Sequence, residues 1–260
     1  MSQTSPIALF DAHLHIIDPW YPLVPNHGYL PPPFTVADYL NRLKDWRLVG
    51  GVVVSGSFQA FDQGYLYDAL RRLGPGFVAV TQLPADVDDD QVLELDRIGV
   101  RAVRFNVQRG GSESLAQLER LAHRVHALAG WHVELYADAA SLADMEDRLC
   151  SLPAVSVDHL GLSAEGLPTL LRLVERGVRV KATGFGRVDF DVRAALRDLC
   201  SANPDGVMFG TDLPSTRAPR PYSDDDLLLV AESLGERQAL KVLCTNSVDW
   251  YRPRRRERRS

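Results

Sequence analysis

Eight short apolar segments, separated by longer stretches with helical periodicity, constrain the fold of this 260-residue chain more than any other feature. Their near-continuous apolar character, as in Val52-Val53-Val54, is typical of strands buried on both faces of a parallel sheet. Strands that alternate with helices form either a closed barrel or an open, doubly wound sheet. The count of eight predicts a single (β/α)8 barrel, of the α/β class. The open sheet is the alternative, and no Gly-x-Gly-x-x-Gly follows the first segment to favour it. The eight segments are residues 7–14, 51–55, 77–83, 100–106, 131–136, 154–160, 178–183 and 206–211.

Between these segments, six stretches place apolar residues at helical spacing: 35–46, 114–129, 141–149, 167–175, 192–200 and 224–234. Thr35 is positioned as an N-cap, and Gly130 and Gly177 stand where C-terminal caps are expected. One long irregular stretch, residues 18–34, contains six prolines and several aromatic residues. A loop of this length in a compact domain usually has a function, and its aromatic residues predict an ordered lid over the barrel mouth.

Composition excludes several classes of protein. Hydrophobic residues make up 45% and charged residues 24%, as in ordinary soluble proteins, and the net charge of −5 does not favour nucleic-acid binding. Residues 252–260 sum to +5 and predict a basic, solvated and disordered tail, so the domain assignment is a barrel over 1–251 and a tail over 252–260. The N-terminus has no signal-peptide pattern, and no segment is apolar enough to span a membrane.

The three cysteines, Cys150, Cys200 and Cys244, are widely spaced and form no CxxC pair. Their spacing favours free thiols in a reducing compartment, and we expect a cytoplasmic protein.

The ends of three segments carry residues suited to catalysis. In a barrel of this kind the active site forms at the C-terminal ends of the strands. His13 and His15 end the first segment, two residues apart and therefore on the same side of a strand. His159 ends the sixth segment and Asp212 ends the eighth. A single histidine or aspartate there is more often structural, but all four at one mouth predict an active site.

These motifs resemble those of a known family. Residues 11–15 read Asp-x-His-x-His, residues 158–161 read Asp-His-Leu-Gly, and residues 210–214 read Gly-Thr-Asp-x-Pro. In this order and spacing they resemble the amidohydrolase superfamily, and within it the branch of the 2-pyrone-4,6-dicarboxylate lactonase and related sugar and muconolactone lactonases. The resemblance spans nearly the whole chain. It implies a (β/α)8 barrel and a hydrolase that acts on the carboxylic ester bond of a lactone.

The same resemblance implies the residues that hold the substrate. Ser57 matches a serine that contacts substrate at the end of the second strand. Arg104 matches an arginine that holds a substrate carboxylate, and Arg109 and Arg187 are candidates to assist it. Tyr136 would add a neutral hydrogen bond. Arg104 lies within an apolar segment, so its guanidinium needs an anionic partner, which is either a bound anion or an internal acid.

The metal content is decided by a departure from the superfamily pattern. Members with two metals use a lysine on the fourth strand, where this chain has Arg104, and a histidine on the fifth, where His132 stands at the wrong end. One divalent metal such as zinc, on His13, His15 and Asp212, remains an alternative, because imidazole and carboxylate are zinc ligands. The branch includes enzymes that need no metal, and we expect no cofactor. Leu213 replaces a tryptophan common in relatives, so the substrate is not carried over.

The sequence therefore predicts the hydrolysis of an anionic lactone. Asp212 would act as the general base, while His13, His15 and His159 would polarise the carbonyl. A metal-dependent amidohydrolase or non-oxidative decarboxylase is the alternative, and a catalytically silent binding protein is the second. The expected partner is a small anionic molecule and neither nucleic acid nor a membrane; a homo-oligomer is compatible with the sequence.

Overall fold

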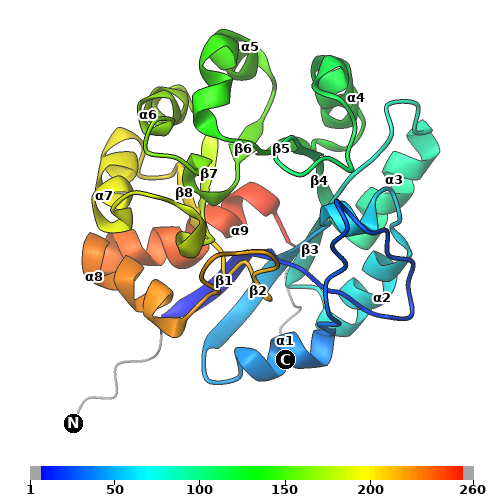
Figure 1. Cartoon of the computed structure of the whole chain (residues 1–260), viewed down its shortest axis with the longest axis horizontal. Coiled ribbons are helices and arrows are strands. Elements are labelled where there is room, and N and C mark those ends of the chain that lie inside the picture. Colours follow the sequence, from blue (N-terminus) through cyan, green and yellow to red (C-terminus); the bar gives the residue numbers. More distant parts are fainter. Residues whose placement is uncertain (1–6, 254–260) are drawn as a thin grey trace, which may run out of the picture.

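The fold is a ring of eight parallel strands with helices around it, and the computed structural model describes residues 7–253 (Figure 1). Each strand pairs with the next along the chain, in the order β1 to β8. The first and last strands meet through a parallel bridge between Leu14 and Leu213 and through hydrogen bonds from the Asp212 amide to the His13 carbonyl (2.8 Å) and from the His15 amide to the Leu213 carbonyl (2.8 Å). The single (β/α)8 barrel is thereby confirmed. The strands are β1 (Ala8–Leu14), β2 (Arg47–Val54), β3 (Phe77–Thr81), β4 (Val100–Asn106), β5 (His132–Tyr136), β6 (Val155–Val157), β7 (Arg179–Ala182) and β8 (Val207–Phe209).

Helices fill the intervals between strands and two of their predicted ends are confirmed. Thr35 accepts a hydrogen bond from the Asp38 amide and forms a capping box at the start of α1, while Gly130 ends α4 with a left-handed φ of 67°. Two helices, α2 and α3, occupy intervals to which the sequence analysis assigned no helix. The helices are α1 (Val36–Arg42), α2 (Gly64–Leu73), α3 (Asp89–Ile98), α4 (Leu118–Ala129), α5 (Glu146–Ser151), α6 (Leu167–Glu175), α7 (Val192–Ala202), α8 (Asp224–Leu240) and α9 (Asn246–Tyr251). None of these helices, within residues 7–253, is long and apolar enough to cross a membrane.

The apolar core has two parts. The larger part lies between the strands and the surrounding helices. A smaller part fills one side of the barrel interior with residues of β1 to β4 and β8, and Tyr251 of α9 packs against it, stacked on Phe10 at 6.4 Å between ring centroids. Because Phe10 and His132 stand near the starts of their strands and both contact α9, this helix covers the N-terminal end of the barrel. His132 is therefore buried at the end of the barrel opposite the mouth, as its place at the start of the fifth strand predicts.

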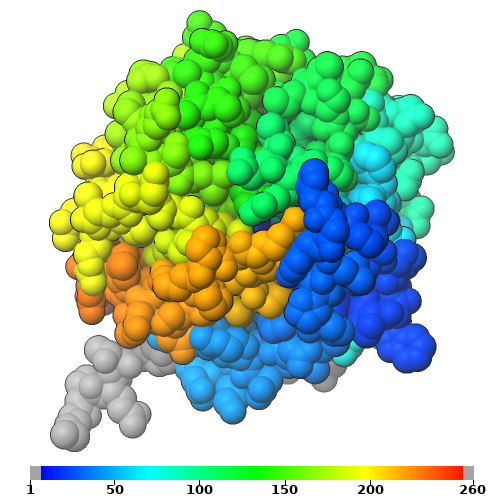
Figure 2. Space-filling model, viewed as in Figure 1, coloured from blue at the N-terminus to red at the C-terminus, as the bar shows by residue number. Residues whose placement is uncertain are grey.

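Residues 18–34 form the expected loop without regular secondary structure. Its ends are held together by hydrogen bonds between Ile17 and Phe34, and its tip turns at Asn26 and Tyr29. This loop and the segment that follows β8 meet over the centre of the barrel (Figure 2). Trp20 is 90% exposed, so polar contacts rather than its indole fasten the loop. The expected basic tail lies, from residue 254 onward, outside the described residues; Arg252 donates a hydrogen bond to the Gly130 carbonyl (2.7 Å).

Candidate active site

The four predicted catalytic residues meet at the C-terminal ends of β1, β6 and β8. The rings of His13 and His15 lie 5.0 Å apart, and those of His13 and His159 lie 4.8 Å apart. Asp212 Oδ1 is 3.9 Å from His13 Nε2 and 3.7 Å from His15 Nε2. All four side chains are buried. His159 and Asp212 adopt left-handed φ angles of 52° and 60°, a conformation rare outside glycine that is concentrated at functional sites.

Asp212 is ionised and bound to an arginine. Its Oδ2 accepts a hydrogen bond from Arg187 Nε (2.8 Å) and forms an ion pair with Arg187 Nη2 (2.7 Å). Burial alone would raise the pKa of Asp212, but the charge of Arg187 outweighs it and holds that pKa well below its usual range. Oδ1 has no hydrogen-bond partner among the described residues. The carboxylate therefore presents one unshared oxygen toward the histidines.

Burial keeps two of the histidines neutral, and a backbone contact orients the ring of the third. Burial lowers the pKa of His159 to about 3 and that of His13 well below its usual value. His15 Nδ1 lies 2.7 Å from the Val54 carbonyl, which can only accept, so Nδ1 carries a proton and Nε2 is the nitrogen turned toward Asp212.

A network of buried charges lies directly beneath His13. Lys181 on β7 contacts Glu134 on β5 at 2.5 Å, and Arg104 on β4 contacts Asp158, at the end of β6, at 2.7 Å. These side chains are at most 2% exposed. The sequence analysis did not identify Glu134, Asp158 or Lys181 as site residues. A signal for them exists, because each is a charged residue within or at the end of an apolar segment, as Arg104 is.

The partner that burial demands for Arg104 is an internal acid, Asp158. Arg104 donates from Nε and Nη2 to Asp158 Oδ2 and from Nη1 to the Ser55 carbonyl. Its charge holds the pKa of Asp158 well below the usual range, although burial opposes this. A bound anion is thus not needed to explain the burial of this arginine. The guanidinium still lines the cavity at the mouth, beneath the ring of Tyr136 at 5.2 Å.

A small cavity of about 30 Å³ joins the catalytic and substrate-binding candidates. Its lining includes Asp212, His15 and His159 together with all five predicted substrate residues: Ser57, Arg104, Arg109, Tyr136 and Arg187. It also includes Arg217, from the loop after β8, which the sequence analysis did not name. Arg217 donates to Ser57 Oγ (3.1 Å) and Asn26 Oδ1 (3.0 Å) and lies over the Tyr29 ring at 4.6 Å. The lid is therefore fastened across the mouth.

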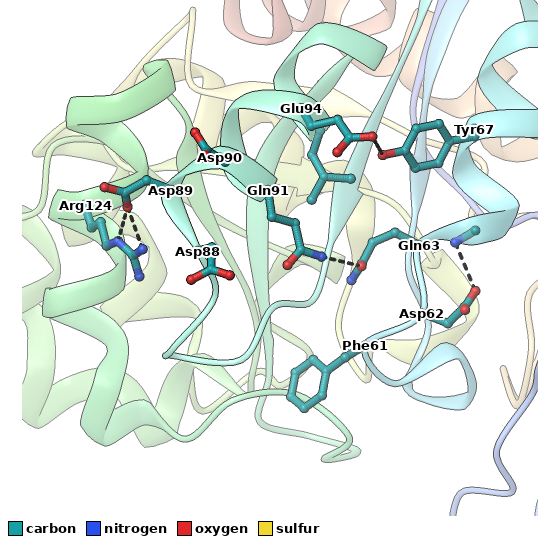
Figure 3. Close-up of a pocket in the computed structure, with 12 residues that line it drawn as sticks. Phe61, Asp62, Gln63, Tyr67, Asp88, Asp89, Asp90, Gln91, Glu94 and Arg124 are labelled. Carbon is teal, nitrogen blue, oxygen red and sulfur yellow. Dashed lines mark hydrogen bonds and ion pairs between the residues drawn. The ribbon is translucent and has the colours of Figure 1, made fainter.

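A larger groove lies away from these residues. It has a volume of about 840 Å³ and lies at the N-terminal ends of α2 and α3 (Figure 3). Its lining is mainly acidic, and an ion pair between Arg124 and Asp89 and a hydrogen bond from Tyr67 to Glu94 occupy part of it. No histidine lines it. The chemistry of the molecule is therefore assigned to the small cavity at the barrel mouth.

Two groups of side chains have the donor types of a metal site. In the first, nitrogens of His13 and His159 and an oxygen of Asp212 lie within 4.8 Å of one another. Each of these residues has one side-chain atom without a hydrogen-bond partner in the part of the chain that the structure describes: His13 Nε2, His159 Nδ1 and Asp212 Oδ1. This group contains His159 where the sequence analysis placed His15. The second consists of His13, Glu134 and Asp158, and the ammonium of Lys181 already contacts all three.

The first group has the donor types and the spacing of a zinc site. Its ability to bind zinc depends on which ring nitrogen of His13 carries the proton. Lys181 Nζ lies within hydrogen-bonding distance of His13 Nδ1, at 3.4 Å. An imidazole that accepts at Nδ1 carries its proton on Nε2, which then has no lone pair for a metal. With this tautomer the residues would not hold a metal through Nε2, whereas with the proton on Nδ1 they would fit one.

Comparisons with known proteins agree with this geometry. The family model described as amidohydrolase matches residues 10–252. A 2-pyrone-4,6-dicarboxylate hydrolase of Comamonas testosteroni is 26% identical over 252 aligned residues, which cover 86% of this chain and 82% of the relative. An Agrobacterium tumefaciens structure superposes with a TM-score of 0.82 at 22% identity, covering 96% of this chain and 97% of that one. A Pseudomonas putida protein proposed to be a 2-pyrone-4,6-dicarboxylic acid hydrolase gives a TM-score of 0.78 at 25% identity, covering 95% and 98%.

Proposed function

This chain belongs to the amidohydrolase family, and we propose that it hydrolyses a lactone that carries a carboxylate or another anionic group. The observation that carries the proposal is the unshared oxygen of Asp212, which lies among three histidines beside a cavity lined by arginines. The similarity to a 2-pyrone-4,6-dicarboxylate hydrolase supports the same bond type. The identity of the lactone is left to experiment, because Leu213 alters the motif that follows Asp212.

In the proposed reaction, Asp212 removes a proton from a water molecule as the water oxygen adds to the lactone carbonyl. The negative charge that develops on the carbonyl oxygen is stabilised by N–H groups of His13 and His159. The ring oxygen then leaves as the hydroxyl of the product and takes the proton that Asp212 received. His15 has a modified role: with its proton on Nδ1, a neutral ring offers an acceptor at Nε2, so it orients the water rather than polarising the carbonyl.

The anionic group of the substrate is assigned to the arginines of the mouth. Arg104 and Arg187 are each paired with an internal carboxylate, whereas Arg109 and Arg217 form no carboxylate ion pair within residues 7–253. Burial and the neighbouring charge of Arg109 lower the pKa of Arg217. An anion between these two guanidinium groups would relieve their repulsion, and guanidinium binds carboxylate with two parallel hydrogen bonds. Ser57 and Tyr136 line the same cavity and add neutral hydrogen bonds.

We propose that the reaction needs no metal. Three cationic side chains, Arg104, Lys181 and Arg187, offset the carboxylates of Glu134, Asp158 and Asp212, so the histidines stand in a cluster that the chain itself balances in charge. A metal-dependent amidohydrolase or decarboxylase is the second candidate, favoured by the spacing of the His13, His159 and Asp212 donor atoms. A bound zinc would act there as a Lewis acid.

A pH-indicator screen over a panel of lactones, with and without a chelator, tests this proposal. We expect acid release with at least one carboxylated lactone, little with its uncharged analogue, and the same rate after chelation. Activity that disappears on chelation and returns with zinc alone would favour the second candidate. No turnover of any lactone, with thermal shifts absent across the panel, would favour a catalytically silent protein.

A further inference from the structure

Lys181 is the cation nearest to the buried nitrogen of His13. It is fully buried on β7, and its ammonium contacts three groups: Glu134 Oε2 at 2.5 Å, His13 Nδ1 at 3.4 Å and Asp158 Oδ1 at 3.7 Å. Two carboxylates beside one ammonium keep it charged, and an ammonium can only donate hydrogen bonds. The contact with His13 is therefore one in which the imidazole accepts.

A competing arrangement would place the proton of His13 on the same nitrogen. Asp158 Oδ1 also lies 3.4 Å from His13 Nδ1, and a carboxylate would accept a hydrogen bond from it. The ammonium decides between the two arrangements: a proton on Nδ1 would face an N–H group of Lys181 at 3.4 Å, whereas an unprotonated Nδ1 accepts a hydrogen bond from it. The ammonium of Lys181 contacts both His13 Nδ1 and Asp158 Oδ1.

We propose that Lys181 is a positioning residue, which donates to Nδ1 of His13 and so keeps the proton of that ring on Nε2, facing the substrate. The inference rests on the proposed function, because a proton on Nε2 matters when His13 has to stabilise an oxyanion. His13 Nε2 has no partner among the described residues, as expected for a donor whose acceptor is the substrate. Glu134 holds Lys181 in place and Arg104 holds Asp158, so the network fixes which nitrogen donates.

The first measurement is the ¹⁵N spectrum of the wild-type chain labelled at its histidines, with His13 assigned by its absence in His13→Gln. Protonated and unprotonated ring nitrogens differ widely in chemical shift, so the spectrum reports the tautomer directly. We expect Nδ1 of His13 to be unprotonated and Nε2 to carry the proton. A proton on Nδ1 would overturn the inference, whatever the enzyme hydrolyses.

The second measurement uses Lys181→Met, which keeps the length of the side chain and removes the donor. We expect the proton of His13 to move to Nδ1, toward Asp158, and kcat to fall by about 10²-fold with little change in KM, the effect of losing one oxyanion donor. Because Lys181→Met leaves Glu134 without its partner, the double variant Lys181→Met/Glu134→Gln serves where the single variant does not fold.

Tyr251→Phe is the matched control. Tyr251 donates to the same carboxylate, Glu134 Oε2, at 3.2 Å, from the opposite end of the barrel and without contact to His13. It should lower the melting temperature but change neither the tautomer nor kcat. A loss of kcat in Lys181→Met with an unchanged His13 tautomer would show that Lys181 is only structural. Failure of the wild type to hydrolyse any lactone would reject the proposed function, while the spectra still decide the role of Lys181.

Discussion

In the proposed reaction, Asp212 has to be ionised and yet basic enough to take a proton from water. Arg187 secures the first requirement and weakens the second, because it holds the pKa of this carboxylate far below neutral pH. The conflict is eased if the anionic group of the substrate draws hydrogen bonds from Arg187 when it binds. Arg187 lines the cavity beside Arg109 and Arg217, so an anion bound there is within its reach. Substrate binding would then raise the basicity of Asp212 at the moment when it is needed.

Asp212→Asn tests the base directly. The amide keeps the shape of the side chain and cannot take the proton, so we expect kcat to fall by about 10²–10⁴-fold while the substrate still binds. Steady-state kinetics on the lactone found in the screen give both parameters, and circular dichroism checks the fold. A folded variant with nearly full kcat would exclude Asp212 as the base and leave His15, whose Nε2 faces the same space.

The sequence could predict which candidate residues gather at the barrel mouth but not their internal partners. His13, His15, His159 and Asp212 were found because each ends a predicted strand, and parallel strands in a barrel end at one mouth. The partner of Arg104 could not be chosen between a bound anion and an internal acid, because that choice depends on which strands face each other across the barrel. Arg217 lies in a loop whose path no periodicity predicts.

The strands of the barrel were easier to predict than its helices and loops. Continuous burial on both faces leaves a strong apolar signal, and the segment 100–106 coincides with β4. Helix α2 begins at Gly64 without a side-chain cap, which removes the usual sign of a helix start, and α3 begins in an acidic run. Residues 139–145 form a tight 3-10 turn before α5, so the predicted helix over 141–149 was placed too early. The presence of the lid followed from its length, but its attachment did not.

Asn26 attaches the lid to two other loops through its side chain. Asn26 donates to the Arg109 carbonyl at 3.0 Å and accepts from Arg217 at 3.0 Å, and so joins the loops that follow β1, β4 and β8. The cavity beneath is far smaller than a drug-sized ligand requires. Substrate entry therefore requires these loops to separate.

Asn26→Ala should loosen the lid without unfolding the barrel. We expect faster amide hydrogen exchange in residues 18–34, with exchange in the strands unchanged, because the loop loses the two hydrogen bonds of the Asn26 side chain. The control is Asn41→Ala, an exposed asparagine of α1. Equal exchange in the two variants would show that other contacts, such as that of the Val24 amide with the Phe58 carbonyl, hold the lid.

The interior of the barrel has an apolar side and a charged side. Side chains of β1 to β3 fill one side with valine and phenylalanine, while Arg104, Glu134 and Lys181 fill the other with paired charges. Helix α9 covers the N-terminal end beneath both: Tyr251 stacks on Phe10 and also donates to Glu134, and Trp250 donates to His132. The end of the barrel opposite the mouth is thus tied to the stability of the whole molecule, and His132 makes that stability dependent on pH.

His132→Gln tests this dependence. Burial and the charge of Lys181 lower the pKa of His132 well below its usual value, and Trp250 donates to its Nε2 at 3.1 Å, so the folded state holds it neutral. The unfolded chain takes up this proton near pH 6.5, so the stability due to a neutral His132 is present above pH 6.5 and is lost as the pH falls. A glutamine does not titrate. The variant should be less stable than the wild type at pH 7, and the difference should shrink by about 2 kcal/mol at pH 5.

Urea unfolding of both proteins at pH 7, 6 and 5 gives the two free energies of unfolding at each pH. His123→Gln serves as the control, because this histidine of α4 is exposed in the folded protein and its replacement should shift stability equally at each pH. A difference between the wild type and His132→Gln that stays constant from pH 7 to pH 5 would mean that the folded protein protonates His132 as readily as the unfolded chain does. In that case the contact with Trp250 could not be one in which His132 accepts, and α9 would be held by the ring stacking of Tyr251 on Phe10 instead.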